Sequence, residues 1–454
     1  MAGMLTAASA IAKPPNIVFI LVDDMGWTDV GYMGSKFYET PHIDRLACQG
    51  VKFTQAYSAC TVCSPTRAAI LTGKYPARLH LTDYIIGRGR PFAKLKIPDW
   101  TPYLPLETMN IARLLKPALY TSVSIGKWHL GQEAHYPEHQ GFVQNIGGTA
   151  GGQPPSYFSP YGIPTLSDGP EGDFLSDRLT DEAIKFIEAN KNQPFFVYLP
   201  HYAVHTPLMA KPEVIEKYRK KASADYPQNN AVYAGLVESV DDSVGRLMAK
   251  LDELELTENT LVIFTSDNGG FLQTTVNLGL RDGKGSAYEG GVRVPLIVRW
   301  PGVTEAGSAC DTPVTSVDFL PTLREIAGVE EPAKQAIDGE SLVPLLKQTG
   351  GLKRDTIYWH YPHYHAGGAT PYAALREGDL KLIEFYEDDH IELYNLKDDL
   401  AEKNNLAKSL PEKAAQLRKK LHLWQTDVGA QMATPNPNHR PGGPPSKSGR
   451  MNQK

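Results

Sequence analysis

Short runs of consecutive apolar residues recur along the chain, and most of them lead directly into polar residues. Runs of this length, rich in valine, isoleucine and phenylalanine and without polar alternation, are typical of strands buried on both faces of a sheet. Such a sheet needs helices on both sides to cover it, which constrains the chain to a layered α/β fold. The runs lie at residues 16–22, 122–125, 194–199, 260–264 and 295–298.

A segment between two of these runs has the pattern of an amphipathic helix. Apolar residues recur at helical spacing from Val232 to Leu251, and charged residues such as Glu238 and Lys250 lie between them. The alternation of strand and helix therefore predicts an α/β sandwich.

A second region begins near Gly350. Its segments 372–376, 380–383 and 392–396 are short, mixed in polarity and separated by turns, which predicts antiparallel strands. The segment 410–426, with a proline near its start, predicts a helix.

The chain changes character again after this helix. From Thr434 onward proline, glycine, asparagine, serine and lysine dominate, and we expect this tail to be disordered. The sequence thus predicts a catalytic α/β domain at residues 14–349, a smaller C-terminal domain with an antiparallel sheet and a helix at residues 350–433, and a tail at residues 434–454.

The composition excludes several classes of protein. The 454 residues include 41% hydrophobic residues and a formal net charge of −5, which is typical of a globular chain with a sizeable core. This charge balance gives no reason to expect a nucleic-acid partner. No apolar run approaches the roughly 18 residues that span a bilayer, so we expect no membrane span.

The first residues leave the compartment open. Ala8-Ser9-Ala10 is similar to a signal-peptide cleavage site, but a basic start and a full apolar core are missing. Residues 1–13 are either a trimmed export signal or a disordered start, and we expect a periplasmic or secreted location.

Four of the predicted strands lead into ionisable or metal-ligating groups. Any one such ending is common turn or helix-cap chemistry, but four together favour a site. In open α/β sheets, ligands bind outside the carboxyl ends of the strands. The four endings are Asp23-Asp24, Gly126-Lys127-Trp128-His129, His201 to His205, and Ser266-Asp267-Asn268-Gly269-Gly270.

Asp23, Asp24, Asp267 and Asn268 form a set of oxygen donors only. Oxygen donors favour Ca²⁺ or Mg²⁺ over Zn²⁺, which prefers histidine and cysteine. A histidine-rich stretch elsewhere lacks recognisable zinc spacing, and we interpret it as a wall of the substrate pocket or as packing. It contains His360, His363 and His365.

Cys63 precedes a predicted helix that Pro65 starts and Gly73 ends. Unpaired backbone N–H groups at a helix N-terminus favour an anion, and Arg67 lies about one turn along. The Cys60-x-x-Cys63 spacing offers a redox alternative, but no thioredoxin-like context surrounds the pair.

The segment Cys63-Ser64-Pro65-Thr66-Arg67, followed by Leu71-Thr72-Gly73, resembles the Cys-x-Pro-x-Arg motif of type I sulfatases, in the alkaline phosphatase superfamily. In that family the cysteine is oxidised to formylglycine. The resemblance covers nearly all of residues 14–410 in the family's order. Further matching segments are Asn16-Ile17-Val18, Asp23-Asp24, Gly126 to His129, His205-Thr206-Pro207, Ser266 to Gly270, Gly283-Lys284 and Glu289 to Pro295.

The resemblance implies a role for each matching residue. Formylglycine at position 63 would be the nucleophile as its hydrate, and Arg67 would hold it. Lys127 and Lys284 would bind the sulfate, and His129 and His205 would be the acid–base pair, with His201 as a competing candidate for the acid. The implied ligands of Ca²⁺, or of Mg²⁺, are Asp23, Asp24, Asp267 and Asn268.

The same resemblance implies a fold and a reaction. The fold is a large mixed, mostly parallel β-sheet sandwiched by helices, as in alkaline phosphatase. The reaction is hydrolysis of a sulfate monoester, most plausibly on a sulfated carbohydrate, after maturation by a formylglycine-generating enzyme. Open alternatives are an arylsulfatase of broad specificity, a phosphonate or phosphodiester hydrolase, and a binding protein that has lost the modification.

Overall fold

An eight-stranded sheet forms the centre of the computed structural model, which describes residues 14–87, 89–330 and 335–441. The strand order is β10-β2-β9-β8-β1-β7-β5-β6; β9 runs antiparallel to its two neighbours, and the other pairs are parallel. The predicted mixed, mostly parallel sheet is therefore confirmed. The strands are β1 (Asn16–Val22), β2 (Val51–Phe53), β5 (Thr121–Ile125), β6 (Gln144–Ile146), β7 (Phe195–Pro200), β8 (Thr260–Ser266), β9 (Leu296–Arg299) and β10 (Ser308–Cys310).

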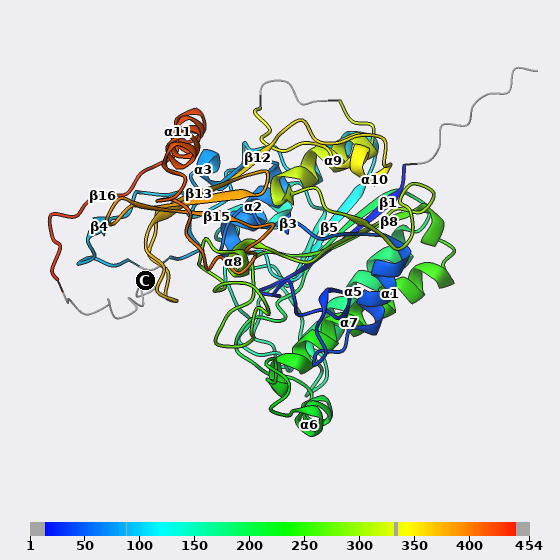
Figure 1. Cartoon of the computed structure of the whole chain (residues 1–454). Helices are drawn as coiled ribbons and strands as arrows, with labels where there is room; N and C mark the ends of the chain where they lie inside the picture. The colour runs from blue at the N-terminus through cyan, green and yellow to red at the C-terminus, as the bar shows by residue number, and fades with distance from the viewer. Residues whose placement is uncertain (1–13, 88, 331–334, 442–454) are drawn as a thin grey trace, which may run out of the picture.

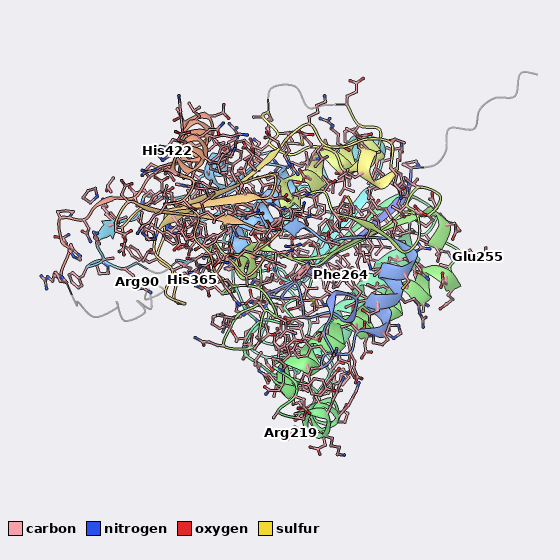
Figure 2. The ribbon with its side chains drawn as sticks, in the orientation of Figure 1. Arg90, Arg219, Glu255, Phe264, His365 and His422 are labelled. Atoms are coloured by element: carbon pink, nitrogen blue, oxygen red, sulfur yellow. The ribbon has the colours of Figure 1, made fainter. Side chains whose placement is uncertain are left out.

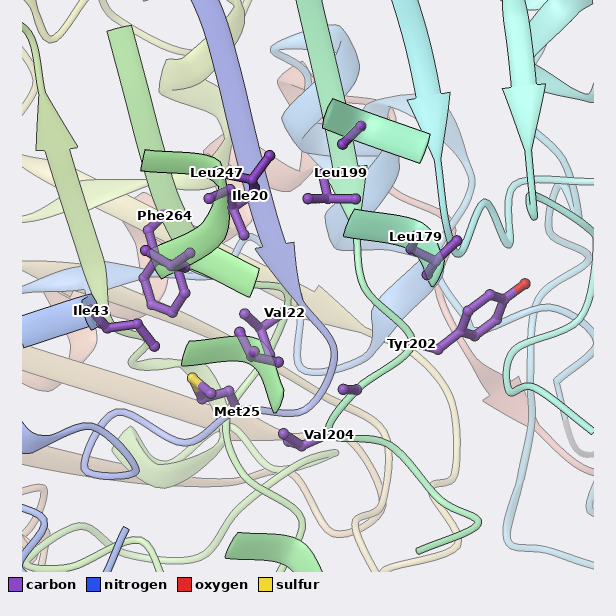
Figure 3. Packing of buried hydrophobic residues seen from close by; sticks show 14 of the residues in the cluster. Ile20, Val22, Met25, Ile43, Leu179, Leu199, Tyr202, Val204, Leu247 and Phe264 are labelled. Carbon is purple, nitrogen blue, oxygen red and sulfur yellow. The ribbon is translucent and has the colours of Figure 1, made fainter. Parts of the chain in front are cut away.

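Helices cover both faces of this sheet (Figure 1). Side chains alternate along β1, so that Val18, Ile20 and Val22 pack on one face and the residues between them pack on the other. Figure 3 shows Ile20 beside Leu247, and Val22 near Met25, on the first face. That face carries α1 (Pro41–Gln49), α5 (Leu175–Asn190) and α7 (Ala231–Glu253), and the other carries α2 (Cys63–Thr72), α4 (Ile111–Leu115), α9 (Phe319–Ile326) and α10 (Val343–Leu346).

Shorter elements connect these layers. Helix α6 (Pro212–Lys221) packs against α7, and β3 (Ala56–Tyr57) pairs with β11 (Val314–Thr315). Two further short helices are α3 (Pro76–Leu79) and α8 (Glu289–Val292). The described 3₁₀ turns are Gly31–Met33, Lys116–Ala118, Glu133–His135, Pro137–Gln140, Thr257–Asn259 and Ser316–Asp318.

A four-stranded antiparallel sheet follows in the C-terminal part, in the order β12-β13-β14-β15. Helix α11 (Pro411–Asp427) packs on one face, and the other face packs against Tyr57 and Val292 of the larger domain. The predicted antiparallel sheet and helix are confirmed, whereas the division at residue 350 stays a prediction. The strands are β12 (Thr356–Tyr361), β13 (Tyr372–Glu377), β14 (Leu380–Phe385) and β15 (His390–Asn395).

The expected disordered tail needs a correction at its start. Strand β16 (Thr434–Pro435) pairs antiparallel with β4 (Leu95–Lys96). The Asn436 side chain reinforces the pairing, because its Nδ2 donates to the carbonyls of Pro91 and Ala93 at 3.0 and 2.7 Å. Backbone and amide hydrogen bonds thus order a segment that has few apolar residues. The rest of the predicted tail, residues 442–454, lies outside the described residues, as do residues 1–13.

Among the described residues, no helix is both long and apolar enough to cross a membrane.

Candidate active site

The strands β8, β1, β7 and β5 are neighbours and run parallel, so their carboxyl ends meet at one edge of the sheet. The structure thereby brings together the polar residues that follow them. They are Asp23 and Asp24 after β1, Lys127 and His129 after β5, His205 after β7, and Asp267 and Asn268 after β8.

Special backbone conformations direct several of these side chains. Gly126 has φ 116°, and a Cβ there would lie 2.1 Å from the carbonyl oxygen of Pro200, so the chain leaves β5 through a position that only glycine fits. Asp24 and His129 adopt the left-handed region, with φ 65° and 55°. Residues without glycine's freedom occur there mainly at turns and functional sites.

Arg67 and Lys127 form a buried charge network with two aspartates. The Arg67 guanidinium donates to Asp267 Oδ2 through Nε and Nη2, at 2.9 and 2.7 Å, and Nη1 donates to the Lys127 carbonyl at 2.9 Å. Lys127 Nζ lies 2.6 Å from Asp23 Oδ2. All four side chains are fully buried. Removing either the acids or the cations would leave the other charges buried without a partner, which is strongly destabilising.

A second group lies beside this network, around Asp24. Lys284 Nζ lies 2.7 Å from Asp24 Oδ1, and His205 Nε2 lies 3.6 Å from Asp24 Oδ2. The site as a whole then holds the carboxylates of Asp23, Asp24 and Asp267 against the cations Arg67, Lys127 and Lys284.

Burial and neighbouring charges shift the acids in different directions. Burial would raise the pKa of Asp24, but Lys284, His205 and Lys127 outweigh it and hold that pKa well below its usual range. The pKa of Asp267 is also lowered, because Arg67 and Lys127 outweigh its burial. Burial raises the pKa of Asp23, and the nearby charges of Asp267 and Asp24 raise it further.

The arrangement fits a divalent cation bound through oxygen. Two buried oxygens, Asp23 Oδ1 and Asn268 Oδ1, have no hydrogen-bond partner, although buried acceptors normally have one. Ligand atoms of Asp23, Asp24 and His205 lie within 4.8 Å of one another. Carboxylate and amide oxygens at such a site suit Ca²⁺ or Mg²⁺.

Cys63 is the first residue of α2 and lies next to His129. The distance from Cys63 Sγ to His129 Nδ1 is 3.3 Å, and His129 Nε2 contacts the carbonyl oxygen of Ile85. Because a carbonyl only accepts, the neutral ring carries its hydrogen on Nε2 and presents the Nδ1 lone pair to position 63. Burial and Lys127 hold the pKa of His129 well below its usual range, which favours this neutral form.

A cavity of about 600 Å³ opens in front of these groups. The predicted residues Asp24, Cys63, His129, His205 and Lys284 line it, whereas Arg67 and Lys127 lie behind them. The remaining lining residues are Tyr84, Ile85, Gly152, Gln153, Thr206, Phe271, Gln273, His365 and Ala366.

His201 does not reach the cavity. Its ring is fully buried, with Nε2 3.2 Å from the hydroxyl of Ser243 on α7. His205 is 15% exposed in its side chain and lines the cavity, so the structure favours His205 over His201 as a candidate acid.

The histidine-rich stretch divides between two roles. His365 lines the cavity. His360 and His363 are buried in the C-terminal part, where His360 contacts the Tyr386 hydroxyl at 2.9 Å and His363 contacts Thr82 at 2.8 Å. The stretch therefore serves both predicted purposes: His365 forms part of the pocket wall, and His360 and His363 contribute to packing.

Sequence reasoning missed the lining residues that come from loops. Gln153 lies in a loop rich in glycine, proline and tyrosine, and Phe271 and Gln273 follow the predicted metal ligands by a few residues. Tyr84 and Ile85 follow the nucleophile helix without any recognisable pattern. Proximity to a motif is the one signal that could have found Phe271.

Asp83, behind this wall, is a buried acid outside the predicted set. The Tyr361 hydroxyl and the Tyr84 N–H donate to Oδ1 at 2.8 and 2.9 Å, whereas Oδ2 has no hydrogen-bond partner and lies 3.8 Å from His363 Nδ1. Burial raises the pKa of Asp83 to about 7.

Relative to the wild type, we expect Asp83→Asn to raise the free energy of unfolding more at pH 8 than at pH 5. Between the ordinary pKa of 3.8 and about 7, the folded state keeps a proton that the unfolded state releases, so this carboxyl lowers stability as pH rises. The effect is at most about 4 kcal/mol. Thermal unfolding of both proteins at the two pH values measures it, and an equal difference in melting temperature at both would contradict the buried neutral acid.

Comparison with known proteins gives the family. The family model described as sulfatase matches residues 15–329, and the model described as N-sulphoglucosamine sulphohydrolase, C-terminal, matches residues 279–428. A sulfatase of Formosa agariphila is 34% identical, over 91% of this chain and 89% of that protein. Human N-acetylgalactosamine-6-sulfatase is 34% identical, over 78% of this chain and 69% of its own length.

A solved structure agrees with these relatives. The crystal structure of Ps i-CgsB in complex with k-i-k-neocarrahexaose superposes with a TM-score of 0.78, at 32% identity over 92% of this chain and 94% of that chain. The fold and the site together define a hydrolase of the alkaline phosphatase superfamily. Within it, the chain belongs to the sulfatase family and is a sulfuric ester hydrolase. Sulfatases are generally metal-dependent, in agreement with the acidic site described above.

Proposed function

We propose that the protein hydrolyses sulfate monoesters of a carbohydrate, using formylglycine formed from Cys63 and a bound Ca²⁺. The observation that carries the proposal is the placement of Cys63 at the start of α2, 3.3 Å from His129 and in the wall of a cavity that Lys284 and His205 also line. Mg²⁺ is the alternative ion. A formylglycine-generating enzyme is the proposed partner during maturation.

The metal would be held by Asp23, Asp24, Asp267 and Asn268. When bound, it supplies positive charge that offsets the negative charge of the sulfate group. The two oxygens without partners, on Asp23 and Asn268, support this assignment.

The cationic side chains serve the anionic substrate. A sulfate monoester repels an approaching nucleophile, and positive groups fixed in a buried site reduce that repulsion at no cost of reorganisation. Lys284 lines the cavity and would bind the sulfate oxygens directly. Lys127 lies behind the lining residues, where it forms an ion pair with Asp23, and its positive charge would attract the sulfate from there. Arg67 would fix Asp267 and the carbonyl of Lys127, beneath position 63.

The two histidines would move protons on opposite sides of the sulfate. His129 presents Nδ1 to position 63 and would accept a proton from a hydroxyl of the hydrated formylglycine. His205 would donate a proton to the departing alcohol from Nε2, and it can do so only as the doubly protonated ring. Burial and Lys284 lower the pKa of the ring to about 3, so the negative charge of the bound sulfate would have to stabilise that form. The Nδ1 of His205 is held by the Thr206 carbonyl at 2.8 Å, which leaves Nε2 facing Asp24 and the cavity.

We expect His205→Ala to lower kcat by about 10²- to 10⁴-fold on an alkyl or sugar sulfate, since an alkoxide leaves poorly without a proton. The loss should be far smaller on 4-nitrophenyl sulfate, whose leaving group needs little protonation. His201→Ala is the matched control, because His201 is buried away from the cavity. Equal losses of kcat on both substrates, or a larger loss in His201→Ala, would reject the assignment.

Some of the relatives support a carbohydrate substrate, whereas others of similar identity are named steryl-sulfatases. One relative is named as acting on a sulfated N-acetylgalactosamine, and Ps i-CgsB was solved with a neocarrahexaose. In this chain, aromatic and amide side chains line the cavity, which suits the stacking and hydrogen bonding of a sugar ring. They are Tyr84, Gln153, Phe271, Gln273 and His365.

Sulfate release from a panel of esters tests the proposal. The panel holds sulfated galactose, N-acetylgalactosamine and N-acetylglucosamine oligosaccharides, 4-nitrophenyl sulfate, a phosphodiester and a phosphonate monoester. The expected result is the highest kcat/KM on one of the sulfated sugars. Highest turnover of the aryl sulfate would assign a broad arylsulfatase, and faster cleavage of the phosphorus esters would reject a sulfatase. Fractionation of the producing cell tests the predicted periplasmic or secreted location.

A further inference from the structure

The pocket wall formed by Tyr84 and Ile85 continues into an extended arm beside the active site. The arm consists of residues 89–98, which contain β4, and residues 434–441, which contain β16, and we call it the basic arm. In Figure 1 the two strands project from the C-terminal sheet at the left of the view. The arm is held beside the cavity, because the Leu95 N–H donates at 3.0 Å to the hydroxyl of Tyr364, the residue before the lining residue His365.

Arg90 makes the most direct link between the basic arm and the cavity. Its guanidinium donates to the carbonyl of His365 at 2.9 Å and lies 5.7 Å from the centre of the Tyr364 ring. His365 itself lines the cavity, and Figure 2 labels Arg90 and His365 side by side. A positive charge is thus fixed at the edge of the cavity.

The charge of the basic arm has one sign. It contains no aspartate or glutamate, although the whole chain has a formal net charge of −5. Lys94 and Lys96 are exposed on either side of the buried Leu95, so on an extended strand they point to the same side. The cations of the arm are Arg90, Lys94, Lys96 and Arg440.

These cations also lack acidic partners. Within the described residues, none of the four side chains forms an ion pair. Two acids lie next to the arm: Glu387 accepts from the Tyr364 hydroxyl at 2.6 Å, and Asp99, which follows residue 98, is exposed. Several lysines elsewhere in the protein differ in this respect. Examples of paired lysines are Lys211 with Asp177, Lys217 with Glu39, Lys250 with Glu188 and Lys413 with Glu377.

We propose that the basic arm binds a sulfated polysaccharide beyond the sugar unit whose sulfate is removed. A row of unpaired cations attracts a polyanion, and this row begins at the cavity where a sulfate ester would react. The inference rests on the proposed function and adds to it that the substrate is an extended chain with further sulfate groups, rather than a small ester.

The test compares polymer binding with turnover of a small ester. Migration of the enzyme in native gels that contain carrageenan, fucoidan or chondroitin sulfate measures affinity for the polymer, and 4-nitrophenyl sulfate measures turnover. In Lys94→Gln/Lys96→Gln we expect about five- to tenfold weaker binding to at least one polymer, with aryl sulfate turnover within about twofold of wild type. Binding by the wild type should weaken as salt rises.

Lys116→Gln/Lys191→Gln is the matched control. Both lysines are exposed and precede β5 and β7, so they lie at the opposite edge of the sheet from the active site. Equal binding by the arm variant and this control, or equal loss of aryl sulfate turnover and polymer binding, would overturn the inference. The inference would also be overturned if the arm variant lost more affinity for a DNA duplex than for any of the sulfated polymers.

The two proposals fail in different ways. If the proposed function is wrong, the sulfated sugars of the panel release no sulfate, whether or not polymers bind. If only the inference about the basic arm is wrong, sulfate release persists and the arm variant migrates like the wild type.

Discussion

Cys63→Ser is expected to lower sulfatase activity by about 10⁴-fold or more while leaving the fold intact. Serine is close to cysteine in size and fits the buried start of α2, but it lacks the thiol that would be converted to an aldehyde. In the active wild-type protein, the peptide containing residue 63 should be about 18 Da lighter than its cysteine form. Sulfate release and intact-peptide mass spectrometry check the two expectations.

Cys60→Ser is the control for this experiment. Cys60 is buried three residues earlier and does not line the cavity, and burial raises the pKa of its thiol to about 12, so it is a poor nucleophile. We expect its loss to leave activity within a fewfold of wild type. A large loss of activity in Cys60→Ser would favour the redox function suggested by the Cys60-x-x-Cys63 spacing. An unmodified Cys63 thiol in fully active protein would reject the formylglycine mechanism.

Asp267→Asn is expected to reduce activity by about a thousandfold and to abolish the stabilisation that calcium gives the wild type. Asparagine keeps an acceptor for the Arg67 guanidinium, which donates to Asp267 Oδ2 at 2.7 Å, but removes the negative charge that a divalent cation requires. An ion at a hundred times its Kd stabilises the folded state by about 2.7 kcal/mol. Thermal unfolding with and without Ca²⁺ or Mg²⁺ measures the loss and shows which ion the wild type prefers.

Asp29→Asn separates a lost metal ligand from a lost buried carboxylate. Asp29 is fully buried near the site, where the Tyr233 hydroxyl and the Gly26 N–H donate to its Oδ2 at 2.5 and 2.9 Å, but it does not line the cavity. This variant should melt at a lower temperature and still gain stability from the ion. A calcium-dependent shift that survives in Asp267→Asn would remove Asp267 from the metal site.

The centre of the sheet could be predicted from the sequence because burial on both faces leaves an unbroken apolar run. The run at residues 16–22 coincides with β1, and the helical spacing between Val232 and Leu251 lies within α7. The edge strands escaped prediction. β6 (Gln144–Ile146) and β10 (Ser308–Cys310) are short and partly exposed, so their residues carry no apolar pattern to read.

The residues of the candidate site also fall into a part that could be predicted from the sequence and a part that could not. Asp23 and Asp267 follow buried strands directly and Lys127 follows one residue later, and the parallel topology brings such residues together without further information. The carbonyl of Ile85, which contacts His129, could not be predicted, because any residue supplies a carbonyl. The order at β16 was also missed, since it depends on amide hydrogen bonds from Asn436 rather than on apolar burial.

The burial of α2 has a consequence for how the protein is made. Every residue of this helix is buried, and Cys63 is only 3% exposed. If Cys63 is converted to formylglycine as proposed, an enzyme acting on the folded protein would have to reach a side chain inside the cavity, at the start of a helix buried along its whole length. We therefore expect the proposed oxidation to take place before the chain folds, and protein that folds with an unmodified Cys63 to stay inactive.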